Sequence, residues 1–203
     1  MADLPIDLGN ELTDQLARVL DVETKIPRTL DALGPVAGRD VTLLDGAAGI
    51  RARQLAELGA RVGFADVDAS ERIGAPDASA DVLVSLWGPF RGTSATETTE
   101  AGRVLRPGGR LLVLLDYGRD DVSRLRGDLP EYGLLSRRDG PLLGAGFKVR
   151  VVHCFWTFAS LGEANSFLDS AFGAIGREVA RAMKRPRLSY NVAVYHRTME
   201  SPA

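Results

Sequence analysis

Apolar positions along the chain follow two periods, and their order predicts helices alternating with strands. Between Glu11 and Leu33 apolar residues recur at helical spacing, interrupted by Pro27, which lacks an amide donor. This stretch predicts two helices. The short apolar runs that follow predict strands at Val41–Asp45, Arg61–Asp66, Asp81–Leu86, Arg110–Asp116, Val149–Phe155 and Asn191–Tyr195.

Further helices are predicted between these strands. Arg51–Leu58 has helical spacing, Ser94–Leu105 begins with a serine and a glutamate at capping-box spacing, and the same pair recurs at Ser160 and Glu163. A helix between two strands joins them in parallel, and the nearly continuous apolar run Arg110–Asp116 is typical of a central strand. The pattern predicts an α/β fold with helices on both faces of a mostly parallel sheet.

Length and composition indicate one domain. The chain has 203 residues, 45% of them hydrophobic, which predicts a single unit over residues 1–203, with an N-terminal helical segment (1–38) and an α/β core (39–203). With 25 basic and 27 acidic residues it shows no strong nucleic-acid or membrane signal. No secretion-signal pattern or membrane-length apolar run is seen, so a cytoplasmic location is predicted. The single cysteine, Cys154, excludes an internal disulfide, and no metal site is predicted.

The residues that follow the first two strands predict a ligand site. Open parallel sheets bind ligands beyond the carboxyl ends of their strands, where the strand order reverses. Gly46 and Gly49 allow close approach to the backbone, although tight packing explains them equally well, and Asp66 has the spacing of a ribose-binding acid. Asp45 would repel a pyrophosphate, and the turn lacks the three-glycine fingerprint, so a phosphate-free ligand is favoured over a dinucleotide.

Several runs resemble motifs of the class I S-adenosylmethionine-dependent methyltransferases, in particular the type 11-like group. They are VTLLDGAAG, GARVGFAD, SADVLVSL, GRVLRPGGRLLVL and the closing segments GFKVRVVHCFWTF and LSYNVAVYH. The resemblance implies a Rossmann-like fold with an antiparallel strand near the C-terminus, transferase activity and S-adenosylmethionine as cofactor. It also implies a cofactor site formed by Asp45, Gly46, Ala47, Gly49, Asp66 and Leu86.

The chain departs from the family in its glycine-rich turn. Ala47 and Arg51 stand where the family has glycines, and an Arg51 side chain directed at the cofactor would repel its positive charge. Two functions therefore stay open. One is a methyltransferase acting on a small molecule, and the other is a catalytically degenerate pseudoenzyme that serves as a binding, regulatory or assembly module for a protein partner.

A second departure lies between the second and third predicted strands. Only 14 residues separate Asp66 from Asp81, where the family inserts a further strand and helices, so the sheet should lack about one strand. The acid that binds adenine then has no clear counterpart, and Asp68 and Asp77 are the candidates. The Arg61–Asp66 strand would become an edge, which predicts a covering N-terminal segment or a homodimer through that edge.

A substrate pocket is predicted from residues after the third and fourth apolar strands. Trp87 and Phe90 fit an aromatic wall, or they simply close the core. Asp116 and Tyr117 fit substrate binding or proton transfer, or they cap a loop. No catalytic residue is assigned, because methyl transfer depends mainly on alignment. His153, between apolar neighbours, is interpreted as a hydrogen-bonded core histidine.

Overall fold

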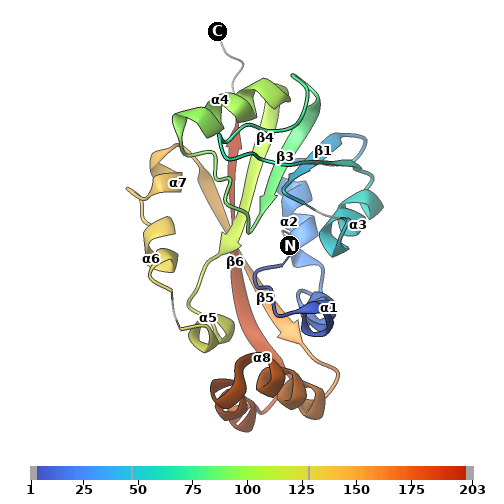
Figure 1. Cartoon of the computed structure of the whole chain (residues 1–203), viewed down its shortest axis with the longest axis vertical. Coiled ribbons are helices and arrows are strands. Elements are labelled where there is room, and N and C mark those ends of the chain that lie inside the picture. Colours follow the sequence, from blue (N-terminus) through green and yellow to red (C-terminus); the bar gives the residue numbers. More distant parts are fainter. Residues whose placement is uncertain (1–3, 47, 128, 200–203) are drawn as a thin grey trace.

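The computed structural model describes residues 4–46, 48–127 and 129–199, and its centre is a six-stranded sheet (Figure 1). The strand order is β2-β1-β3-β4-β6-β5, with β1 to β4 parallel and β6 antiparallel to both of its neighbours. The expected parallel sheet with an antiparallel strand near the C-terminus is confirmed. The strands are β1 (Asp40–Leu44), β2 (Arg61–Ala65), β3 (Ala80–Leu86), β4 (Leu105–Asp116), β5 (Lys148–Thr157) and β6 (Arg187–Thr198).

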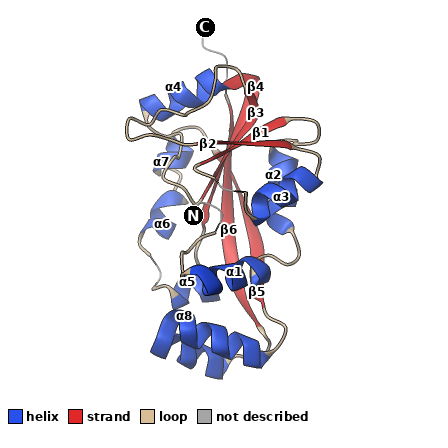
Figure 2. Ribbon diagram, turned by 45° about the vertical axis from the view of Figure 1, so that its right-hand side comes forward, coloured by secondary structure: helices blue, strands red, loops and turns tan. Residues whose placement is uncertain are grey.

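Helices cover both faces of the sheet, as the apolar pattern predicts (Figure 2). Alternate residues of the strands point to opposite faces, so that Leu112 and Leu114 belong to one apolar core and Leu111 and Val113 to the other. The first core is covered by α1 (Asn10–Val19), α2 (Lys25–Leu33), α3 (Ile50–Glu57), α5 (Asp121–Leu125) and α8 (Leu161–Ala182). The second is covered by α4 (Ala95–Val104), α6 (Glu131–Leu135) and α7 (Pro141–Gly144).

A local sequence signal explains the start of α4, whereas the start of β4 differs from the prediction. The capping box at the start of α4 is present, with the Glu97 amide 3.0 Å from the Ser94 hydroxyl and the Ser94 amide 3.2 Å from the Glu97 carboxylate. The fourth strand begins earlier than predicted, at Leu105, because Leu105 already pairs with Ala80. The register then shifts before Arg110 pairs with Val82, so the expected turn forms an irregularity within β4.

β2 lies at the edge of the sheet, as the missing strand requires. The expected N-terminal cover over this edge is wrong, because α1 and α2 make their main contacts with β5, β6, α3 and α8. The Phe64 side chain on β2 is 47% exposed. Pairing of this edge with a second copy of the chain stays a prediction.

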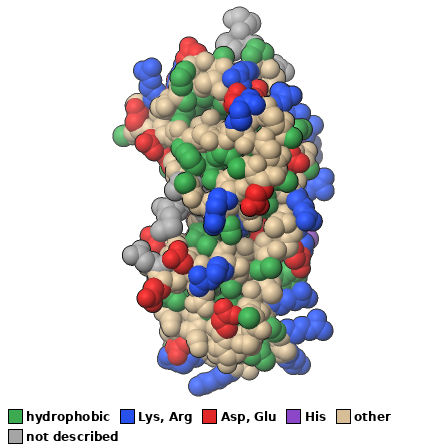
Figure 3. Space-filling view, turned by 90° about the vertical axis from the view of Figure 1, so that its right-hand side faces the viewer, with side chains coloured by type: hydrophobic (Ala, Val, Ile, Leu, Met, Phe, Trp, Pro, Cys, Tyr) green, Lys and Arg blue, Asp and Glu red, His purple; other side chains and the backbone are tan. Residues whose placement is uncertain are grey.

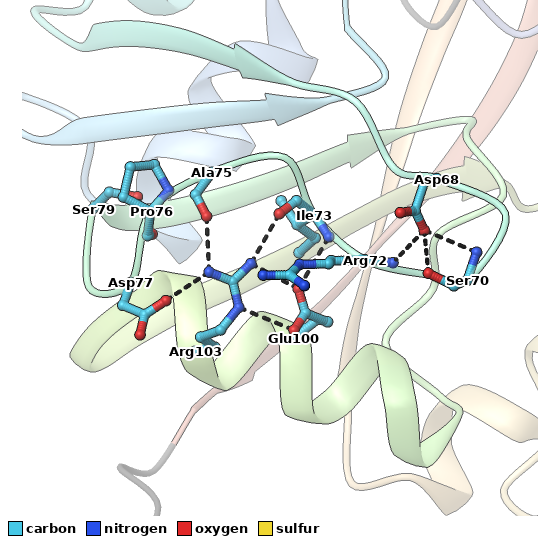
Figure 4. A network of polar contacts seen from close by, with 10 residues as sticks. All are labelled: Asp68, Ser70, Arg72, Ile73, Ala75, Pro76, Asp77, Ser79, Glu100 and Arg103. Carbon is cyan, nitrogen blue, oxygen red and sulfur yellow. Dashed lines mark hydrogen bonds and ion pairs between the residues drawn. The ribbon is translucent and has the colours of Figure 1, made fainter.

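The short connection from β2 to β3 crosses the sheet without a helix and is attached to α4 by Arg103 (Figure 4). The Arg103 guanidinium makes five hydrogen bonds of 2.7–3.0 Å, and these use all five of its donors. Its partners are the carbonyls of Ile73 and Ala75 and the carboxylates of Asp77 and Glu100. Ile73, 1% exposed, supplies apolar contact to the second core, so one arginine and one isoleucine fasten the connection where a helix would otherwise pack.

The surface carries both charge signs, but not evenly. Figure 3 shows acidic and basic side chains mixed over most of one face and Lys and Arg side chains predominating along its right-hand edge. The His153 side chain is exposed rather than part of the core, although it makes the expected hydrogen bond, 2.8 Å from its Nδ1 to the Asn191 amide oxygen. None of the helices in the described ranges is long and apolar enough to span a membrane.

Candidate functional site

The strand order reverses beside β1, which pairs with β2 on one side and with β3 on the other. Asp45 follows β1 and Trp87 follows β3, and both have left-handed backbone conformations, with φ of 49° and 51°. Aspartate tolerates this region, whereas a bulky tryptophan rarely adopts it. Such strain concentrates at functional sites because the surrounding structure must maintain it. This carboxyl end of the sheet, formed by the residues after β1 to β4, is named the carboxyl-end site.

Two carboxylates lie where β1 and β2 end. The Asp45 amide donates to the Ala65 carbonyl at 2.9 Å, and its Oδ1 accepts the Val67 amide at 2.8 Å, so Asp45 ties the two strand ends together. Asp66 is exposed. Within the described part of the chain neither carboxylate forms an ion pair, so this corner of the carboxyl-end site carries uncompensated negative charge.

The turn after β1 is explained partly by packing. A Cβ on Gly46 would lie 2.6 Å from the Leu43 Cβ, so a glycine is required there whether or not a ligand binds. Gly49 is the N-cap of α3 and has an ordinary φ of −89°. Ala47 lies outside the described residues. The tight-packing interpretation is therefore supported at Gly46, while a cofactor role for the turn stays a prediction.

Arg51 is buried, which corrects the expectation that it repels the cofactor. Its side chain is 0% exposed, and its guanidinium lies 3.6 Å from the Asp21 carboxylate and 2.7 Å from the Gln54 side-chain oxygen. Asp21 also accepts the amides of Lys25 and Ile26 at the start of α2. A buried charge is stable only when it is paired, and the pair of Arg51 with Asp21 links α3 to the N-terminal segment.

The Asp116 carboxylate, at the end of β4, holds Trp87 in place. The indole Nε1 of Trp87 donates to Asp116 at 2.9 Å, and the Trp87 amide donates to the Leu114 carbonyl at 2.9 Å. The Asp116 carboxylate also accepts from the Tyr190 hydroxyl, the Arg126 guanidinium and, at 3.4 Å, the Tyr132 hydroxyl. A carboxylate with four donors fixes its neighbours well but is poorly suited to act as a free base.

Three members of this network were not found from the sequence. Arg126, Tyr132 and Tyr190 lie 10, 16 and 74 residues from Asp116, and no motif connects them. Burial, with the negative charge on Asp116 adding to it, raises the pKa of Tyr132 to about 12. Burial likewise raises the pKa of Tyr190 well above its ordinary value. Both hydroxyls therefore keep their protons and act as donors over the physiological range.

The predicted substrate residues do not form one wall. Trp87 packs against the first core, whereas the Phe90 side chain, 2% exposed, belongs to the second core on the other face of the sheet. Phe90 therefore closes the core, which was the other interpretation of this residue. Tyr117 also packs on the second core, and Leu86 is 1% exposed, so only its backbone can line the site. Of the four predicted substrate residues, the structure brings Trp87 and Asp116 into direct contact.

The two candidates for an adenine-binding acid lie in different places. Asp68 stays near the end of β2, where its Oδ1 accepts the amides of Ser70 and Arg72 at 2.8 and 3.0 Å and closes a turn. Asp77 is ion-paired with Arg103 at 2.7 Å and lines a cavity near the start of β4, at the opposite end of the sheet, so that assignment is wrong. Residues 4–46, 48–127 and 129–199 contain no group of three metal-ligating side chains.

Comparison with solved structures identifies the fold. No protein-family model matches the chain, and no curated protein matches it. A candidate type II methyltransferase from Anaeromyxobacter dehalogenans aligns with 87% of this chain and 96% of its own, at 20% identity and a TM-score of 0.50. A candidate methyltransferase of an antibiotic biosynthesis pathway from Anabaena variabilis aligns with 88% and 98%, at 13% identity and a TM-score of 0.50.

These similarities extend over most of this chain and nearly all of each aligned structure, so they include its six-stranded sheet. At such low identity they identify architecture and leave the chemistry to the side chains. The protein has the Rossmann-like fold of the class I methyltransferases.

Proposed function

We propose that this protein is an S-adenosylmethionine-dependent methyltransferase that binds the cofactor at the carboxyl-end site and acts on a small molecule. The observation that carries the proposal is the pair of carboxylates at the ends of β1 and β2, Asp45 and Asp66, which form no ion pair with any described residue. S-adenosylmethionine bears a sulfonium and an ammonium group and no phosphate, so uncompensated acids favour it over a dinucleotide. The solved methyltransferases of similar fold support the same assignment.

The residues present fit this cofactor in three respects. Asp66 is exposed at the end of β2, where a ribose-binding acid is expected. Asp45 directly precedes the glycine turn and accepts the Val67 amide through one carboxylate oxygen. The Arg51 side chain is fully buried and ion-paired with Asp21, so it is not an exposed cation at the turn. When bound, S-adenosylmethionine supplies an electrophilic methyl group.

The contribution of the protein to methyl transfer would be alignment. Trp87, held by its hydrogen bond to Asp116, presents a rigid aromatic ring beside the carboxyl-end site. An aromatic face attracts cations, and it offers an apolar wall to an acceptor. Asp116 acts here as a positioning residue, because its oxygens are already engaged by four donors.

A degenerate methyltransferase fold is the second candidate, and specific observations favour it. Gly46 is required by packing alone, Asp45 already holds the Val67 amide, and the β2–β3 connection lacks the unit that would carry an adenine-binding acid. In this alternative the chain is a binding, regulatory or assembly module for a protein partner, and the carboxyl-end site binds no cofactor.

Calorimetric titration with S-adenosylmethionine and S-adenosylhomocysteine separates the two. The first proposal expects a micromolar Kd that weakens at least about tenfold in Asp66→Ala, because a charged hydrogen-bond partner is lost. Asp139→Ala, which removes another exposed acid, should bind as the unchanged protein does. No detectable heat at millimolar ligand would reject cofactor binding and favour the module. Binding of NADH in its place would favour an oxidoreductase.

A further inference from the structure

A groove lies between α5 and the second part of α8, where β5 ends and β6 begins (Figure 1). Its volume is about 620 Å³, within the range of small-molecule sites. We call it the α5–α8 groove. Asp45, Asp66 and Trp87 are not among the residues that line it, so it is distinct from the carboxyl-end site.

The second part of α8 forms an apolar wall of the groove. The helix bends at Gly173, which has a φ of 57°. Its two parts pack against each other, since a Cβ on Gly176 would lie 1.9 Å from the Leu168 carbonyl oxygen. The Ile175 side chain is 58% exposed, so much of this wall is uncovered. The apolar residues that line the groove recur at helical spacing, at Ile175, Val179, Ala182 and Met183.

The floor and the facing wall come from β6 and α5. Leu188 on β6 and Leu125 on α5 line the groove and are 3% and 5% exposed. Residues 187–190 of β6 lie before its pairing with β4 begins, so this edge of β6 has no strand beside it. Side chains from both faces of β6 therefore line the groove, Leu188 from one face and Arg187 and Ser189 from the other.

Asp121 is the one acid among the described residues that line the groove, and its carboxylate is already engaged. It accepts the Ser189 amide at 2.9 Å and the Ser189 hydroxyl at 2.6 Å, and it lies 2.5 Å from the Arg124 guanidinium. Asp121 therefore holds α5 against β6 and is matched in charge by Arg124.

The remaining charged residues of the lining are basic and lie where α8 ends. Lys184, Arg185 and Arg187 form no ion pair with any residue that the structure describes. The Arg187 guanidinium lies 4.3 Å from the centroid of the Phe155 ring, which also lines the groove. The nearby carboxylate of Glu23 is ion-paired with Lys25. This end of the groove therefore carries uncompensated positive charge.

We infer that the α5–α8 groove binds a small anionic amphiphile, with its apolar chain along α8 and its anionic head group near the cations that follow this helix. The lining separates the two kinds of contact. The apolar wall from Ile175 to Met183 is about 12 Å long at a rise of about 1.5 Å per residue, and Lys184 and Arg185 come directly after it. Charge complementarity favours an anion over a neutral or cationic amphiphile. The inference does not depend on the proposed methyl transfer, because the carboxyl-end residues take no part in it.

Calorimetric titration of the full chain with decanoate, below the concentration at which it forms micelles, tests this inference. Decanoate should bind with a Kd at least about tenfold lower than that of decyltrimethylammonium, which has the same chain and the opposite charge. Butyrate keeps the carboxylate and loses most of the chain, so its Kd should be at least about tenfold higher than that of decanoate. Equal binding of decanoate and either of these two compounds would overturn the inference.

Two pairs of exposed variants locate the site. Ile175→Gln should raise the Kd of decanoate about tenfold through loss of an apolar contact. Leu161→Gln, a matched change at the start of α8 outside the groove, should leave it unchanged. Arg185→Gln should raise the Kd about threefold, and Arg181→Gln, four residues earlier and outside the lining, should have a smaller effect. The same Kd for both members of either pair would contradict the proposed site.

NMR spectra of the protein with isotope-labelled methionine methyl groups give a readout specific to the α5–α8 groove. The Met183 signal should move when decanoate binds, while the signal of Met199, which is 5% exposed in the second core, should not. A response of Met199 without one of Met183 would overturn the inference. The same holds if the protein binds phosphatidylglycerol vesicles or an acidic peptide but shows no saturable binding of decanoate.

Discussion

Each end of the sheet has one charged residue at the centre of a hydrogen-bond network, and the two residues have opposite charge. Comparison of the two networks shows that they have different structural roles. At the carboxyl end Asp116 accepts from Trp87, Tyr190, Arg126 and Tyr132. Toward the amino end Arg103 donates five hydrogen bonds to the chain between β2 and β3 and to Glu100. The first network fixes a side chain beside a candidate ligand site, whereas the second replaces packing that a helix would provide.

The uncompensated charges of the two ends also differ in sign. Asp45 and Asp66 leave negative charge at the carboxyl end, and Arg110 and Lys148, which form no ion pair within the described ranges, leave positive charge at the amino end. With a net charge of −2 the whole molecule gives no hint of this separation. Local charge, rather than net charge, therefore indicates which kind of ligand each end can bind.

The largest effect on the free energy of unfolding is expected from removal of the Asp116 carboxylate, which accepts hydrogen bonds from four side chains. Asp116→Ala should lower the free energy of unfolding by about 3 kcal/mol, because it leaves the largely buried Arg126 without its counter-charge. Tyr132→Phe removes only a 3.4 Å hydrogen bond from the same carboxylate and should cost at most about 1 kcal/mol. Urea denaturation measures both. Similar losses in the two variants would show that Asp116 is not the centre of this network.

A smaller effect is expected at Arg103. Arg103→Ala should cost about 2 kcal/mol, since it removes five partly exposed hydrogen bonds, and Arg103→Lys should recover little because an ammonium cannot reproduce the planar fork. Arg124→Ala, which removes an exposed ion pair with Asp121, should cost about 0.5 kcal/mol or less. If urea denaturation gave Arg103→Ala and Arg124→Ala the same stability, the β2–β3 connection would be held by its apolar contacts alone.

The smallest effect on the free energy of unfolding is expected from protonation of His196, which is half-buried near other positive charges. Because the folded-state pKa of His196 lies below its ordinary value of 6.5, the unfolded chain binds the proton more readily. Stability should therefore be highest above about pH 6.5 and should fall as the pH drops through that value. The difference in unfolding free energy between the unchanged protein and His196→Gln should shrink from pH 8 to pH 5. A constant difference would argue that burial and nearby positive charge do not lower the pKa of His196.

Structural features that depend on residues close together in the sequence were predicted correctly. The β4 run is apolar at nearly every position, and the start of α4 has its Ser94–Glu97 box, so both are found where the pattern indicates. The count of residues between Asp66 and Asp81 also predicted the edge position of β2 correctly. The helices α5 to α7 were not predicted, because four or five residues are too few to show a helical period.

The candidate site was predicted less well, because its contacts join distant parts of the chain. Arg51 and Asp21 meet across 30 residues, and Tyr190 reaches Asp116 across 74. Neither pairing follows from spacing. Trp87 and Phe90 are close in sequence, yet their side chains lie on opposite faces of the sheet. The residue types alone could not show that the two side chains point to different faces.

The hydrogen bond between Trp87 and Asp116 gives this protein a natural optical probe. The chain contains two tryptophans, and Trp156 on β5 is fully buried against the aromatic rings of Phe167 and Phe172 on α8. Its fluorescence should stay constant when a ligand binds elsewhere. Trp87 is only partly buried and lies at the carboxyl-end site, so a ligand there changes the polarity around its indole. The emission spectrum of the unlabelled protein can therefore report occupancy of one end of the sheet and not of the other.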